Sequence, residues 1–277
     1  MSTFRLILAG FIFCVAIYLF ISAPPPLPEA NQTQTAARAV EVEHVFKAVN
    51  SVNDAARQIY TSRIVGPGKA AGLAFGEDWA EPGVEKGPLP ALFLRLTAAR
   101  LEAKPTRLSL YLGSDEPINK SNLFDAAQMQ AFDVVRASQA PVFSEIEGVG
   151  VVGMFPDMAS AQPCVTCHNE HEDSPKTDWQ LGDVMGATTW AYPDAVLGAD
   201  DYLATTEATF EAIAEAYGQY LDKVGGFGTS VAIGESWPDE GALALPSIDV
   251  FVAEVRAAAS ASIVDELILL SDVAAIQ

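Results

Sequence analysis

Cysteine and histidine are both scarce in this chain, which has three of each among its 277 residues. Three cysteines are too few for the disulfide framework that stabilises small secreted domains. Cys14 lies in the hydrophobic N-terminal run, whereas Cys164 and Cys167 stand three residues apart. A pair so placed fits a redox dithiol, half of a zinc site or a haem attachment point, and the residues around it decide among these.

Basic residues are scarce as well: 16 lysines and arginines stand against 36 acidic residues, and the formal net charge is −20. The resulting field repels DNA, RNA and anionic lipid headgroups, so nucleic-acid binding is excluded. It attracts basic protein partners, among them small basic electron carriers, although acidic surfaces also serve simply to keep proteins in solution. Half of the residues are hydrophobic, so the chain can build a substantial core of its own.

The N-terminus carries a continuous apolar run. Every residue from Leu6 to Ile21 is apolar or glycine, and the run reaches the lower limit of about 17 residues for crossing a hydrocarbon core. Pro24–Pro26 follow directly, and proline after a cleavage site blocks signal peptidase, so we expect residues 1–23 to remain as a membrane anchor. The alternative is a cleaved signal peptide. With Arg5 on the cytoplasmic side of the inner membrane, the remainder of the chain is expected in the periplasm.

A linker and a long helix are predicted after the apolar run. Residues 24–36 are rich in proline and then polar, which indicates a linker. The helix is predicted from residue 37 to residue 63. Its apolar residues form a heptad-type seam: Val42, Val45, Val49, Val52, Ala56 and Ile59. This seam packs either in its own domain or on a second copy of the chain, as a homodimer.

Strands and helices then follow one another. Residues 64–90 are rich in glycine and proline and are predicted to be irregular. The elements expected after them are a helix at 91–102, a strand at 107–112, a helix at 122–137, a strand pair at 142–155 and a strand at 182–192. Phe124, Met129 and Phe132 are candidates for the core. Together these elements predict an α+β domain over residues 37–192.

Two more helices are predicted beyond that domain, at 201–224 and 248–276, with a loop at 225–246 between them. Serine and acidic residues occur throughout the last of these helices, so it is not a second membrane span. Residues 193–277 are therefore expected to form a helical extension, and we expect it to dock a partner.

The pentapeptide Cys164-Val165-Thr166-Cys167-His168 is the C-x-x-C-H signature of covalent haem, and it falls in a polar loop predicted for residues 156–176. Two thiols three residues apart reach the two vinyl groups of one porphyrin edge, and the adjacent histidine supplies a nitrogen to the iron. A thioredoxin-type dithiol needs a surrounding βαβ pattern, and zinc needs two more ligands where only His44 and His171 remain. The sequence predicts one haem c, attached at Cys164 and Cys167, with His168 on the iron.

The sixth iron ligand stays open among several residues. His171 lies only three residues after His168, which makes the opposite face of the ring hard to reach. His44 lies on the long predicted helix, and at about 100° per residue it points roughly 110° away from the centre of the seam, so it faces either the haem or the solvent. The alternatives are Met158, Met154, Met185 and an open sixth position.

The stretch Cys164–Gly186, CVTCHNEHEDSPKTDWQLGDVMG, resembles a c-type haem domain of PAS-like fold. Domains of this family lie outside the membrane in bacterial histidine kinases, nucleotide cyclases and chemotaxis-type receptors, and they also occur as stand-alone haem proteins in phototrophs. Upstream, Arg107–Ser109 and Ile118–Asn122 are similar to the family as well. The resemblance covers about residues 40–192.

This resemblance implies a PAS-like antiparallel sheet with a long N-terminal helix and a c-type haem loop. It also implies haem attachment at Cys164 and Cys167, iron ligation by His168, and a distal ligand from the first long helix, which favours His44. The receptors of the family continue into a second membrane helix and a cytoplasmic output domain, and neither is seen in this sequence. A signalling role is therefore less favoured than the haem itself.

Two functions from different classes follow from these features. In the first, a membrane-anchored periplasmic haem protein transfers electrons as a subunit or docking partner of a membrane redox complex. In the second, a haem-based sensor subunit reports redox state or a diatomic gas to a separate protein. Enzymatic turnover is not expected, because no positioned acid–base pair is evident near the haem motif: Glu172 and Asp173 could be proposed, but two carboxylates in a polar loop are usually solvated surface groups. Electron transfer is preferred, since it fits the single anchor and the acidic surface.

Overall fold

The computed structural model describes residues 39–228, 232–234 and 244–273. The predicted membrane anchor at 1–23 and the predicted linker at 24–36 lie outside these residues. Within the described part of the chain, no helix is both long enough and apolar enough to cross a bilayer.

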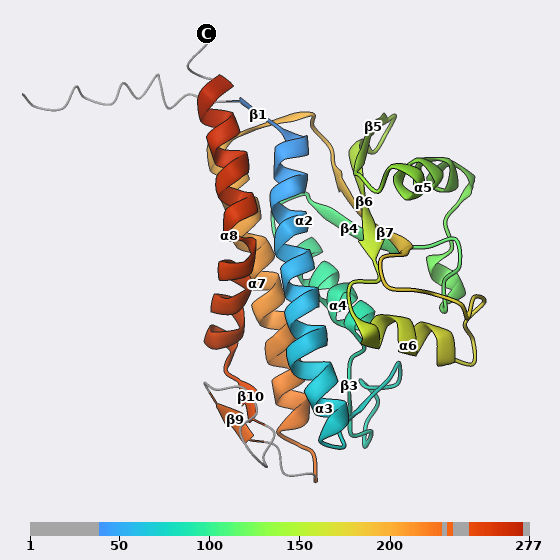
Figure 1. Cartoon of the computed structure of the whole chain (residues 1–277). Coiled ribbons are helices and arrows are strands. Elements are labelled where there is room, and N and C mark those ends of the chain that lie inside the picture. The colour runs from blue at the N-terminus through green and yellow to red at the C-terminus, as the bar shows by residue number, and fades with distance from the viewer. Residues whose placement is uncertain (1–38, 229–231, 235–243, 274–277) are drawn as a thin grey trace, which may run out of the picture. The chain divides into compact units, whose positions relative to one another are not determined.

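A four-stranded antiparallel sheet lies between the long helices and α5 (Ala126–Ser138), and α6 (Gln162–Glu170) lies below the sheet in the view of Figure 1. In spatial order its strands are β4 (Ser109–Gly113), β7 (Val184–Tyr192), β6 (Gly150–Met158) and β5 (Val142–Ile146). All three pairings are antiparallel. Gly148 and Gly150 have positive φ and allow the tight hairpin between β5 and β6. The α+β class with an antiparallel sheet, predicted from the sequence, is confirmed.

Long helices form a layer beside this sheet (Figure 1). This layer consists of α2 (Val42–Ile59), α7 (Ala199–Val224) and α8 (Ile248–Val273). The remaining helices of the described residues are α3 (Gly66–Ala70), α4 (Pro90–Glu102), α5 (Ala126–Ser138) and α6 (Gln162–Glu170), with a π-helical turn η1 (Tyr60–Val65) and a 3-10 turn η2 (Lys120–Asn122). The short strand pairs are β1 (Ala39–Glu41) with β8 (Val196–Gly198), β2 (Ala74–Phe75) with β3 (Lys86–Gly87), and β9 (Ala232–Gly234) with β10 (Ala244–Pro246). Helix α2 packs against both α7 and α8, and α4 packs against α7.

The apolar seam of α2 is buried inside its own chain. Val45 and Val49 are fully buried in a cluster that includes Ala208 and Ala212 of α7. Val52 and Ala56 lie in a second cluster with α7 and α8, and Ile59 packs against its edge. Of the two alternatives that the sequence left open, packing within the domain is therefore the one found.

Aromatic side chains join the predicted C-terminal extension to the predicted domain. Tyr60 stacks on Phe93 with ring centroids 4.3 Å apart, and Tyr217 of α7 stacks on Phe251 of α8 at 4.2 Å. Phe93 meets Phe251 edge-on at 6.0 Å, which links the two stacks. The described residues from Ala39 onward form one compact unit, so α7 and α8 complete the core rather than extend beyond it.

The first long helix differs from its prediction at both ends. Residues 39–41 are extended because they pair with β8, and the backbone N–H of Val42 donates to the carbonyl of Ala195. At the other end the helical path continues through η1 and α3 to Ala70, so the prediction of irregular structure was wrong for residues 64–70. Pro67 lies in the first turn of α3, where a proline without an N–H is tolerated.

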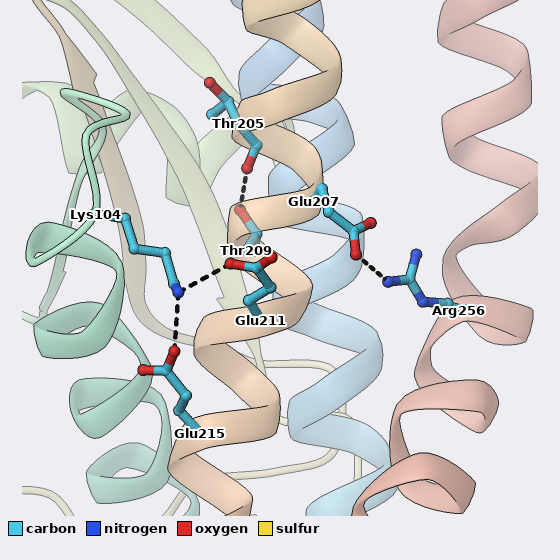
Figure 2. A network of polar contacts seen from close by, with 7 residues as sticks. All are labelled: Lys104, Thr205, Glu207, Thr209, Glu211, Glu215 and Arg256. Atoms are coloured by element: carbon cyan, nitrogen blue, oxygen red, sulfur yellow. Dashed lines mark hydrogen bonds and ion pairs between the residues drawn. The ribbon is translucent and has the colours of Figure 1, made fainter.

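Exposed ion pairs tie α7 to its neighbours on both sides, as Figure 2 shows. Lys104, which follows α4, donates to Glu211 at 3.0 Å and to Glu215 at 2.9 Å. On the other side of α7, Arg256 of α8 donates to Glu207 at 2.7 Å. The hydrogen bond to Glu215, and then that to Glu211, raise the pKa of Lys104.

Removing the Lys104 ion pairs is expected to change stability only slightly. Both carboxylates are about half exposed, with side-chain exposures of 56% and 49%, and water screens such pairs. Lys104→Met should therefore lower the free energy of unfolding by less than about 1 kcal/mol in urea titrations. The matched control is Lys120→Met, which makes the same charge change at an exposed residue. A loss well above that of the control and above this limit would contradict the assignment of these pairs as surface contacts.

Candidate functional site

The C-x-x-C-H motif lies on a helix, α6, and not in a loop. Ala161 is extended and Pro163 stands in the first turn, a position that favours helix initiation. The predicted polar loop at 156–176 was therefore wrong for residues 162–170, and also for residues 156–158, which belong to β6. Residues three and four apart share one face of a helix, so Cys164 lies on the same face as Cys167 and His168.

Helix α6 forms one wall of a mostly apolar cavity. The cavity holds about 1230 Å³ of empty space, part of it open to solvent. Cys164, Cys167 and His168 all line it. The other walls come from α2, η1 and α3, the start of α4, the segment after β4, and the ends of β6 and β7.

The three motif side chains are in the states that haem attachment needs. Both cysteines are half-buried and free of disulfides. Burial raises the pKa of Cys167, partly opposed by the charge of Lys69. Burial, and then the proximity of His171, lower the pKa of His168, so its ring is neutral near pH 7. A neutral imidazole is the form that binds metal ions.

A small hydrophobic cluster holds α6 in place. Val165 on the back of the helix packs with Trp179 and Met185, and Cys164 contacts the same cluster. The side-chain amide of Asn169 donates to the carbonyl of Trp179 at 3.0 Å and accepts from its backbone N–H at 2.8 Å. These contacts orient the cysteines and His168 toward the cavity.

The residues present fit a covalently attached haem. Two free thiols lie on one helix face, the cavity beside them is mostly apolar, and the Nδ1 atom of His168 is buried without a hydrogen-bond partner. Zinc fits less well, because among the described residues no group of three or more His, Cys, Asp or Glu side chains is placed to hold a metal ion. The chemistry of the donor set therefore matches haem c.

The structure does not bring His44 to the cavity. Its Nδ1 atom lies 2.6 Å from Oε2 of Glu266 on α8, and His44 is not among the residues that line the cavity. From the sequence we expected His44 to face either the haem or the solvent. Its contact with Glu266 on α8 was not expected. His171 also lies outside the cavity wall, where its Nδ1 atom accepts from the N–H of Asp173.

The structure places the three candidate methionine ligands in two different surroundings. Met158 and Met185 line the cavity together with His168. Met154 is buried elsewhere, in a cluster with Phe124 and Phe132. Among the predicted alternatives, only Met158 and Met185 therefore share a cavity with the motif.

A stripe of residues missed in the sequence lines the wall formed by α2, η1 and α3. Arg57, Thr61, Val65 and Lys69 stand four residues apart, and all four line the cavity. This spacing, on a helix face other than that of the valine seam, is the signal that could have revealed them. We name these four residues the helical stripe.

The helical stripe brings positive charge to the cavity of an acidic protein. Arg57 donates to Asp157 of β6 and, at 3.4 Å, to Asp54 on its own helix. Burial raises the pKa of Asp54 although Arg57 opposes the shift. Lys69 and Arg95 also line the cavity, and within the described residues neither makes an ion pair. The wall can therefore receive carboxylates such as haem propionates.

Comparison with known proteins agrees with this assignment. The Tll0287-like family (Tll0287) matches residues 30–193, which is more than half of the chain. Comparisons with curated proteins and with solved structures gave no match. The matched region contains the four-stranded sheet, α6 and the helical stripe, whereas α7 and α8 follow it. The chain belongs to the Tll0287-like family, a family of c-type haem-binding domains with a PAS-like fold.

Proposed function

We propose that this chain is a c-type haem protein that transfers electrons outside the cytoplasm, with residues 1–23 as its inner-membrane anchor. One haem is attached at Cys164 and Cys167, and His168 is an axial ligand of its iron. The observation that carries the proposal is the common face of α6, which presents both free thiols and a neutral imidazole to one mostly apolar cavity.

The bound haem would supply a one-electron redox couple, and the protein's own residues would position and tune it. The Trp179 cluster and Asn169 hold α6 against the sheet, which fixes the thiols and His168. Apolar residues of α4, such as Leu92 and Leu94, line the cavity and lower its polarity. Low polarity around a haem and hydrogen bonds to its ligands are the features that set its reduction potential.

The charge of the chain favours a basic redox partner. A protein of net charge −20 steers cationic partners toward itself and repels acidic ones. A basic soluble carrier, or a basic face of a membrane redox complex, has the required chemistry. The proposal therefore predicts electron exchange that is fast at low salt and selective for basic carriers.

This prediction can be tested by stopped-flow mixing of the reduced holoprotein with a small basic c-type cytochrome. The rate constant should fall roughly tenfold or more when the salt concentration rises from about 10 mM to about 200 mM, because ions screen the attraction. An acidic carrier of similar potential is the matched control and should react slowly at low salt. Rates that are slow and independent of salt with both carriers would argue against the electron-transfer role.

A second function, a haem-based sensor of redox state or of a diatomic gas, is favoured by one specific observation. Among the described residues that line the cavity, no histidine and no cysteine lies outside α6. The iron would then lack a strong ligand from the helical stripe, and an exogenous molecule could occupy that position. A partner that responds to such binding would distinguish this function from electron transfer alone.

A further inference from the structure

Thr61 carries a buried hydroxyl group without a hydrogen-bond partner. The residue is only 3% exposed, and its Oγ1 atom makes no hydrogen bond in the structure. Thr61 also lines the cavity described above. Leaving a buried polar group unpaired costs about 1–3 kcal/mol, and a ligand bound in the cavity would remove this cost by accepting the hydrogen bond.

Three other buried threonines in helices of this protein do not behave in this way. Thr97, Thr206 and Thr209 each donate to the backbone carbonyl four residues before them, at 3.1, 2.9 and 2.9 Å. Such back-bonding is the usual solution for a hydroxyl inside a helix. Thr61 has not adopted it, although it lies on a continuous helical path.

The local backbone around Thr61 is also unusual. It belongs to the π-helical turn Tyr60–Val65, in which the N–H of Gly66 donates to the carbonyl of Thr61. Single π-helical turns inside α-helices occur frequently at functional sites. The irregular turn and the unpaired hydroxyl therefore coincide at the same cavity wall.

The helical stripe runs along the cavity beside α6. Lys69 lines the same cavity as Cys167, and its charge acts on the Cys167 thiol. Arg57, about three turns away, lies at the end beside Asp157. Thr61 and Val65 stand between them and line the wall that faces α6. His168 and this middle part of the stripe therefore line the same cavity, in which α6 would hold a haem.

We propose that Thr61 forms a binding subsite for a small exogenous ligand of the haem, a diatomic molecule or linear anion whose outer atom accepts a hydrogen bond from the Thr61 hydroxyl. The proposal rests on haem binding, which both functions proposed above share. A ligand that prefers one oxidation state also shifts the reduction potential by linkage. The subsite would therefore make electron transfer dependent on the ligand.

The test uses the haem-loaded full chain with cyanide for the oxidised protein and carbon monoxide for the reduced protein. Thr61→Val removes the hydroxyl at nearly constant size, and Thr61→Ser keeps it. Thr61→Val should weaken cyanide binding about three- to tenfold, the effect of one hydrogen bond, and should raise the C–O stretching frequency. Thr61→Ser should restore both values to near those of the wild type.

A matched control separates ligand binding from structural effects. Thr188 is also buried, its hydroxyl is also unpaired, and it does not line the cavity. Thr188→Val should leave both readouts unchanged. Neither valine variant should lower the urea midpoint of unfolding, because no hydrogen bond is lost in the protein.

The outcomes distinguish this inference from the proposed function. If the wild type contains covalent haem but binds neither cyanide nor carbon monoxide, the subsite is wrong and the haem proposal stands. Equal affinities and C–O frequencies in the wild type and Thr61→Val would also overturn the subsite. If the wild type carries no haem, the proposed function itself fails.

Discussion

Replacing both Cys164 and Cys167 by serine is expected to abolish covalent haem attachment. The two thiols lie free on one face of α6 at the wall of the apolar cavity, and serine cannot form the thioether bonds. Denaturing gel electrophoresis followed by haem staining measures the result directly, because only covalently bound haem stays with the chain. The wild type should give a stained band and the double variant none.

The matched control for this experiment is Cys14→Ser. It makes the same atomic change in the predicted anchor, outside the motif, and should retain full haem staining. A double variant that still carries covalent haem would show that attachment occurs elsewhere in the chain. His168→Ala is expected to separate ligation from attachment, since it removes an iron ligand and leaves both thiols.

Phe251→Ala is expected to destabilise the whole protein by about 3–5 kcal/mol, the usual cost of truncating a buried phenylalanine. The Phe251 side chain is fully buried, stacks on Tyr217 and meets Phe93 edge-on. The cavity left by truncation would lie at the junction of α8, α7 and α4. The midpoint of urea unfolding, measured on the full chain, reports the change.

Leu267→Ala on the same helix is the matched control. Leu267 is 39% exposed, so its truncation should change stability by no more than about 0.5 kcal/mol. Equal effects of the two substitutions would contradict the placement of α8 in the core. This expected loss for Phe251→Ala also exceeds that for Lys104→Met, because aromatic burial and not surface ion pairing holds α7 and α8 in place.

Much of the fold was accessible from sequence because its signals are local. The heptad-type valines predicted α2, and the buried Val45 and Val49 confirm that this spacing marks an inward face. Alternating and β-branched residues predicted the sheet strands at 107–112, 142–155 and 182–192, close to β4, the β5–β6 pair and β7. The periodicity of apolar residues indicates which face of a helix or strand is buried, whichever element packs against that face.

Elements that depend on a distant partner were the ones missed. Residues 39–41 are extended only because residues 196–198 pair with them. The polar residues of α6 indicated a loop, but Val165 packs on Trp179 and Asn169 binds the Trp179 backbone, which stabilises a short helix. The same limit applies to His44, whose contact Glu266 lies 222 residues away in the chain.

The sequence by itself determined the haem chemistry that we propose. Cys164, Cys167 and His168 lie within five consecutive residues, so their spacing is fixed by the order of residues and does not depend on the fold. The sequence also determined the antiparallel α+β class, through local periodicity. Only the tertiary structure decided what surrounds the motif: it placed His44 against α8, brought Met158 to the cavity and left the Thr61 hydroxyl unpaired there. These outcomes depend on contacts between segments far apart in the chain, and the local order of residues does not identify the distant segment that an element will contact.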